Sequence, residues 1–100
     1  MVRINWTKQA RDDLKGIADF IALDSLKYAK LQIVRIKSRT QILKKQVRIG
    51  KITPEINNPD IRELIEGNYR IVYKIESEKL ISILTIHHSA RDLTRRDISK

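Results

Sequence analysis

The sequence predicts an α+β domain in which two helices and three strands follow a short first strand. Three observations carry this prediction. Residues 61–88 hold three successive segments of strand composition, separated by turn-forming residues. Residues 7–47 instead repeat apolar side chains at helical spacing. With an alternating segment at residues 2–6, the order is β-α-α-β-β-β, which indicates an antiparallel sheet packed on one side against a helical hairpin.

The first strand and the first helix fall within residues 2–22. Residues 2–6 alternate, which places Val2, Ile4 and Trp6 on one face. Thr7 is a suitable N-cap for a helix that we expect to end near Ala22. The expected inner positions of this helix are Ala10, Leu14, Ile17, Ala18 and Ile21, and the expected outer positions are Asp12, Asp13, Lys15 and Asp19.

The second helix should begin after Asp24 and Ser25, which break and recap the chain, and run to about Val47. Two helices joined by such a short turn form an antiparallel hairpin. Its predicted inner stripe consists of Ala29, Ile33, Ile36, Thr40 and Leu43. Residues 49–60 contain two prolines, a glycine and two asparagines, so we expect a loop there.

Three strands complete the domain. Residues 61–65 lead into Gly67-Asn68, a pair suited to a tight hairpin turn. Residues 69–75 alternate, with the apolar side chains toward the helices and Arg70 on the opposite face with its neighbours. A polar turn precedes residues 80–88, in which adjacent His87 and His88 must point to opposite faces. Residues 90–100 are charged and are predicted to form a short C-terminal helical tail.

Length and composition indicate one small cytoplasmic domain spanning residues 1–100. The absence of cysteine excludes disulfides and thiolate metal sites. Two histidines without a convergent third ligand do not predict a metal site. No apolar segment approaches the ~20 residues needed to span a membrane, and the start of the chain does not resemble a signal peptide.

The positive charge is concentrated in one segment. The chain has a formal net charge of +9, from 21 Lys and Arg against 12 Asp and Glu. Residues 26–51 contain no acidic residue and nine basic ones, namely Lys27, Lys30, Arg35, Lys37, Arg39, Lys44, Lys45, Arg48 and Lys51. The rest of the chain is therefore neutral. This segment predicts a polyanionic partner, either a nucleic acid or an acidic protein, although a solvated helix face has the same composition.

Several segments, in this order and at this spacing, resemble the RelE/ParE superfamily, the toxins of bacterial type II toxin–antitoxin systems. They are Trp6-Thr7 with Ala10 to Leu14, Tyr28-Ala29, Pro54-Glu55, Ile61 to Leu64, Asn68 to Tyr73 and His88 to Leu93. The resemblance covers nearly the whole chain and implies the same β-α-α-β-β-β fold, no cofactor and a cognate antitoxin. The residues assigned to antitoxin binding are Lys30, Arg35, Lys37 and Arg39.

The resemblance leaves the target open among three hypotheses. His-x-x-Arg-Asp-Leu after the last strand resembles the ParE branch, which poisons DNA gyrase and uses no catalytic residue. The target-contacting residues would then be Arg62, Arg70, His88 and Arg91. A RelE-like mRNA interferase acting on ribosome-bound messages would use Glu55 as base, Arg70 as phosphate clamp and His88 as acid. The interferase branch carries a late tyrosine where this chain has Ser89, and an inactive relative that acts only by binding is the third hypothesis.

Overall fold

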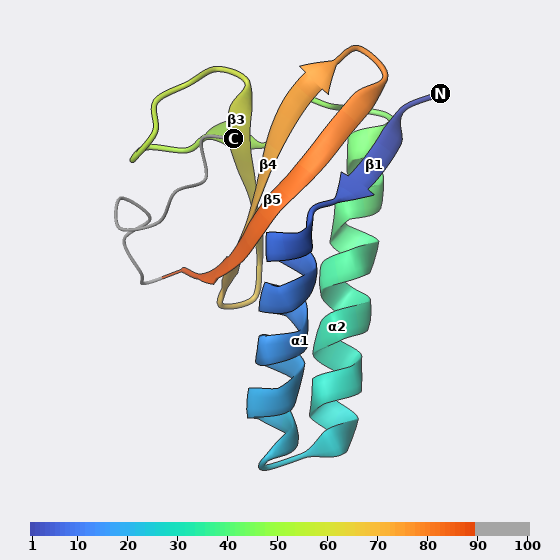
Figure 1. Cartoon of the computed structure of the whole chain (residues 1–100), viewed down its shortest axis with the longest axis vertical. Coiled ribbons are helices and arrows are strands. Elements are labelled where there is room, and N and C mark those ends of the chain that lie inside the picture. The colour runs from blue at the N-terminus through green and yellow to red at the C-terminus, as the bar shows by residue number, and fades with distance from the viewer. Residues whose placement is uncertain (90–100) are drawn as a thin grey trace.

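The computed structural model describes residues 1–89 and contains two helices and five strands. Figure 1 shows the helical hairpin beside a twisted sheet. The elements in chain order are β1 (Arg3–Trp6), α1 (Lys8–Ala22), α2 (Leu26–Thr40), the 3₁₀ turn η1 (Gln41–Lys44), β2 (Lys51–Ile52), β3 (Ile61–Glu66), β4 (Tyr69–Ser77) and β5 (Leu80–His88). The predicted α+β class and element order are confirmed, with one two-residue strand, β2, added inside the predicted loop.

The sheet is mixed rather than antiparallel throughout, which corrects the predicted topology. Its order is β1-β5-β4-β3-β2, and β1 pairs with β5 in parallel, from Arg3 with Leu80 to Trp6 with Ile83. The cause lies in the path of the chain (Figure 1): the hairpin brings it back to the end of the sheet where β1 starts. The antiparallel strands β3, β4 and β5 then alternate in direction, so β5 runs the same way as β1.

Both helices begin at the predicted caps. The Thr7 hydroxyl accepts a hydrogen bond from the Ala10 amide at 3.2 Å and donates one to the Ile83 carbonyl at 2.7 Å, so the cap also fastens α1 to β5. Ser25 accepts from the Tyr28 amide at 3.2 Å and caps α2.

The second helix ends earlier than predicted, at Thr40 instead of near Val47. The Thr40 hydroxyl donates to the Lys37 carbonyl at 2.7 Å, and such local bonds compete with the helical backbone pattern. The chain continues as the 3₁₀ turn η1, which still buries the predicted inner residue Leu43.

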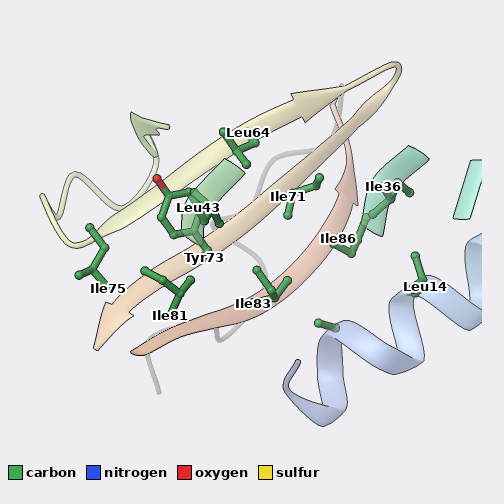
Figure 2. Close-up of a cluster of buried hydrophobic side chains, with 11 residues drawn as sticks. Leu14, Ile36, Leu43, Leu64, Ile71, Tyr73, Ile75, Ile81, Ile83 and Ile86 are labelled. Atoms are coloured by element: carbon green, nitrogen blue, oxygen red, sulfur yellow. The ribbon is translucent and has the colours of Figure 1, made fainter. Parts of the chain in front are cut away.

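The main core lies between the helices and one face of the sheet. Figure 2 shows Leu14 of α1 and Ile36 of α2 among side chains of β4 and β5 such as Ile71 and Ile86. All four are buried, as the helical and alternating patterns predict. The half-buried rings of Trp6 and Tyr69 pack against this cluster, in agreement with their predicted core positions.

Part of the opposite face of the sheet is covered by the segment between η1 and β3, although the start of this segment, at Val47, still packs against the main core. Ile56 packs on a second, small cluster formed by Ile61, Val72 and Leu84. The segment has little room for adjustment, because a Cβ atom on Gly50 would lie 2.6 Å from the Glu63 carbonyl oxygen and 2.7 Å from the Tyr73 hydroxyl. This covering segment places Glu55 over the sheet, beside Arg70.

Candidate functional site

A buried cluster of charges lies on the face of the sheet opposite the helices. Arg70 of β4 is 6% exposed and contacts two carboxylates. Its Nη1 and Nη2 donate to the two Glu55 carboxylate oxygens at 2.7 Å each, and its Nη2 and Nε donate to Glu63 at 2.6 and 3.2 Å. The Lys51 ammonium lies 3.9 Å from the second Glu63 oxygen. The pair with Glu55 is bidentate, a geometry that makes an arginine–carboxylate contact both strong and directional.

This cluster fixes the charge state and the position of Arg70. The hydrogen bonds to Glu55 raise the pKa of Arg70 further above its ordinary value, with Glu63 adding to the same effect. Arg70 lies on the face of the sheet predicted for it, and its carboxylate partners leave it buried there. Glu55 is likewise not a solvated loop residue, since it fastens the loop to the sheet. A phosphate at Arg70 would have to compete with two carboxylates already in place.

Arg62, another predicted target-contacting residue, holds the covering segment by its backbone. The guanidinium donates to the carbonyl oxygens of Pro59 at 2.8 Å, Gly50 at 2.9 Å and Arg48 at 3.2 Å. One side chain therefore supplies hydrogen bonds to three loop carbonyl groups. The described contacts of Arg62 are therefore structural.

The two histidines lie on opposite faces, as the strand period predicts. In the β4–β5 register Arg70 pairs with His87 and Tyr69 pairs with His88. His87 is buried, whereas His88 is exposed and meets the Tyr69 ring edge to face, with 6.0 Å between ring centroids. The sheet therefore lies between Arg70 and His88, and the structure does not bring the predicted set of Glu55, Arg70 and His88 together. Arg91 and the predicted helical tail lie outside the described residues.

The residues predicted to bind an antitoxin lie on two sides of α2. Lys37 lines a groove of about 570 Å³ between α1 and α2, and Lys30 lines its continuation of about 460 Å³. Ala18 and Ile33 line both, so the two form one trough along the hairpin. Arg39 reaches the other way, and its Nε donates to the Ile65 carbonyl of β3 at 3.3 Å. Arg35 is exposed and lines neither groove.

A third groove, of about 550 Å³, lies between α1 and the ends of β4 and β5. One of the residues that line it, Asp13, is not where the helical pattern predicted it. Asp13 was predicted on the outer face of α1, but its Oδ2 accepts hydrogen bonds from the Thr85 hydroxyl and, at 3.2 Å, from the Ile86 amide. Asp13 therefore ties α1 to β5, where a β-bulge shifts the register of the strand.

Residues 1–89 hold neither a cluster of metal-ligating side chains nor a membrane-spanning helix. No group of three or more His, Cys, Asp or Glu side chains in this part of the chain could hold a metal ion. No helix in the same range is long and apolar enough to cross a membrane.

Comparison with known proteins assigns the chain to a family. The family model described as ParE toxin of type II toxin-antitoxin system, parDE, matches residues 4–93. A solved chromosomal ParDE toxin–antitoxin system from P. aeruginosa is 25% identical, with 88% of this chain and 96% of that chain covered and a TM-score of 0.72. A chain of the RelBE2 toxin–antitoxin complex from Mycobacterium tuberculosis shares the fold at 24% identity, with 87% and 96% covered and a TM-score of 0.53. A search of curated proteins gives no match.

The family match spans the strands, the helices and the Arg70 cluster, and the matched ParDE structure has the same architecture. The chain belongs to the ParE family of toxins of type II toxin–antitoxin systems.

Proposed function

We propose that this toxin acts by poisoning DNA gyrase and is neutralised by a cognate antitoxin. The observation that supports a non-nucleolytic mechanism is the separation of Arg70 from His88 by the sheet. Cleavage of RNA by attack of a 2′-hydroxyl needs a base, an acid and a phosphate-binding cation around one phosphate. In this structure Arg70, the phosphate clamp of the interferase hypothesis, is bound to Glu55, the base of that hypothesis. His88, its acid, lies on the other face of the sheet.

The proposed target is a protein–DNA complex rather than an RNA phosphate. A gyrase poison needs a binding surface and no catalytic residue, and His88 at the end of β5 is the exposed member of the predicted target-contacting set in residues 1–89. Of the other members, Arg62 and Arg70 hold the covering segment in place and would support this surface indirectly. Arg91 follows shortly after His88 in the chain and completes the set.

The test is a gyrase cleavage assay with the purified toxin. Supercoiled plasmid, gyrase and ATP are incubated with the toxin, treated with detergent and protease, and separated on a gel. We expect linear DNA to accumulate, and less of it with the His88→Ala variant. A variant of another exposed residue far from this surface, Lys79→Ala in the β4–β5 turn, should behave as wild type.

A folded toxin that produces no linear DNA would contradict the proposal. The same preparation is then added to ribosomes carrying mRNA. Cleavage of the message by wild type but not by His88→Ala would support the interferase alternative, and inactivity in both assays would support the inactive binding module.

A further inference from the structure

The trough between α1 and α2 changes character along its length. At the end next to the sheet, the groove of about 570 Å³ is lined by three cations, Arg11, Lys15 and Lys37. The indole of Trp6 lines the same part, which we call the tryptophan groove. The continuation toward the α1–α2 turn is lined mostly by apolar side chains, with Lys30 as its one cation. The volume of the tryptophan groove falls within the range of ~300–1,000 Å³ that small-molecule sites occupy.

Helical spacing explains why these cations line one groove. Arg11 and Lys15 lie one turn apart on the same side of α1, and Lys37 lies one turn after Ile33 on the side of α2 that borders the groove. Because the hairpin is antiparallel, the first turns of α1 lie beside the last turns of α2. Cations from both helices therefore meet at this end of the hairpin.

These positive charges are poorly balanced by carboxylates. Within residues 1–89, neither Arg11 nor Lys37 has a carboxylate within salt-bridge distance. Lys15 is paired with Asp19 at 2.8 Å, but both side chains are exposed, and such a pair stabilises little. Three cations that share one carboxylate raise the positive potential of the groove and favour a bound anion.

Strand β1 places an aromatic ring beside these cations. The half-buried Trp6 side chain packs against the main core and also lines the groove. Leu14 and Ile33 add apolar surface to the same lining. An indole with apolar neighbours suits a flat heterocycle, because nucleobases stack on tryptophan rings. The groove therefore combines a surface for a base with a site for phosphates.

We propose that the tryptophan groove binds a nucleoside diphosphate or triphosphate. The base lies against Trp6, and Gln41, which also lines the groove, can donate hydrogen bonds to its edge and accept them. The phosphates contact the cations, among which the guanidinium of Arg11 offers paired donors to two phosphate oxygens. The ligand is a small molecule, and its binding depends neither on gyrase as the target nor on the antitoxin.

Two other anions fit the groove less well. A single-stranded nucleic acid needs cations along its whole path, whereas Lys30 alone lines the continuation of the trough. A polyphosphate without a base would use the cations and leave the indole and its apolar neighbours uncovered.

The fluorescence of Trp6 reports on this groove alone, because the chain contains one tryptophan. The whole toxin is titrated with ATP at physiological salt, with excitation at a wavelength that adenine does not absorb. We expect saturable quenching as the base stacks on the indole. Calorimetric titrations with adenosine and with inorganic tripolyphosphate, which each carry one part of the ligand, should give binding at least about tenfold weaker than that of ATP.

A pair of double variants tests the cations. Arg11→Ala/Lys37→Ala should weaken ATP binding roughly tenfold or more, and both side chains are exposed, so the variant should fold. The matched control is Lys8→Ala/Lys27→Ala, which removes one exposed cation from each of the same helices outside the groove and should bind ATP as wild type does. Circular dichroism verifies that each variant is folded.

Four results would overturn this proposal. Folded toxin could show neither quenching nor heat of binding with ATP. Tripolyphosphate could bind as tightly as ATP, which would make the groove a site for phosphate alone. A single-stranded oligonucleotide could bind more tightly than ATP and lose affinity in Lys30→Ala, which would make nucleic acid the occupant. Equal losses in the two double variants would show general attraction between a basic protein and an anion.

Discussion

At the scale of single residues, Arg70 shows how one buried side chain organises a loop. Its guanidinium joins Glu55 of the covering segment to Glu63 of β3 by charge. Removing it would leave the Glu63 carboxylate, whose side chain is 3% exposed, without its close partner and with the Lys51 ammonium 3.9 Å away. A buried charge that loses its partner is strongly destabilising even where the intact pair contributes little.

We therefore expect Arg70→Ala to lower the free energy of unfolding by about 3–5 kcal/mol, measured by urea denaturation. Lys74→Ala, on the same face of β4, removes a partly exposed pair with Glu76 at 3.5 Å and should change stability by less than about 1 kcal/mol. Equal stability of Arg70→Ala and wild type would show that the cluster does not hold the fold. Because of this effect, loss of toxicity in Arg70→Ala would not by itself identify a catalytic residue.

Part of this cluster was predictable from the sequence. The Gly67-Asn68 turn fixes the β3–β4 register, in which Arg70 pairs with Ile65, so Glu63 lies on the same face two residues away. Strand alternation thus placed Arg70 on the correct face. The partner Glu55 was not predictable, because its position depends on a loop that Arg62 and Tyr73, from strands β3 and β4, hold by its backbone at Gly50.

At the scale of elements, two glycines have opposite structural requirements. Gly50 packs against the backbone of β3 and donates its amide to the Tyr73 hydroxyl at 3.0 Å. Gly16 lies within α1, and a Cβ there would have no neighbour within 4 Å. The loop therefore needs a glycine at position 50 for its close approach to β3. In α1, by contrast, Gly16 meets no such need and lowers the stability of the helix.

Substitution of each glycine by alanine tests this difference. We expect Gly50→Ala to lower the free energy of unfolding by about 1–3 kcal/mol, because the methyl group would overlap the β3 backbone and the Tyr73 ring. Gly16→Ala should raise it by up to about 1 kcal/mol through helix propensity. Thermal and urea denaturation of both variants provide the measurement, and a stabilised Gly50→Ala would contradict the packing described for β2 and β3.

The helices were predicted more accurately than the sheet because their signals are local. Caps at Thr7 and Ser25 and the apolar stripes of α1 and α2 depend on residues three or four apart. The parallel pairing of β1 depends instead on where the chain returns after the hairpin. The bond of Asp13 to β5 depends on a β-bulge, and neither feature has a local sequence pattern.

At the scale of the whole molecule, the net charge of +9 is carried by α2 and the segment that follows it. This concentration was predicted from the sequence, and four of its cations were assigned to antitoxin binding without being placed on one side of the helix. In the structure, Lys30 and Lys37 face the trough with α1, while Arg39 contacts β3. A partner that used all four would have to extend around α2.

A charge reversal on this helix tests the electrostatic part of antitoxin binding. We expect Arg35→Glu/Lys37→Glu to weaken binding of the cognate antitoxin and to flatten the dependence of the dissociation constant on salt, because fewer opposite charges meet at the interface. Calorimetric titrations at several salt concentrations measure both quantities. Lys8→Glu, at the start of α1, is the control with the same kind of charge change outside α2. Unchanged affinity and salt dependence would remove α2 from the interface.

The parallel pairing of β1 with β5 also has a consequence for the order of events during synthesis. The cap residue Thr7 bonds to Ile83, 76 residues later, so the first helix is fastened to the sheet only after the last described strand has left the ribosome. Contacts between segments so distant in sequence form slowly, because a long loop must close before they can contribute. A nascent toxin therefore lacks its complete sheet until translation of this domain is nearly finished, and a truncated product ending before β5 would leave β1 without the strand that it pairs with in residues 1–89.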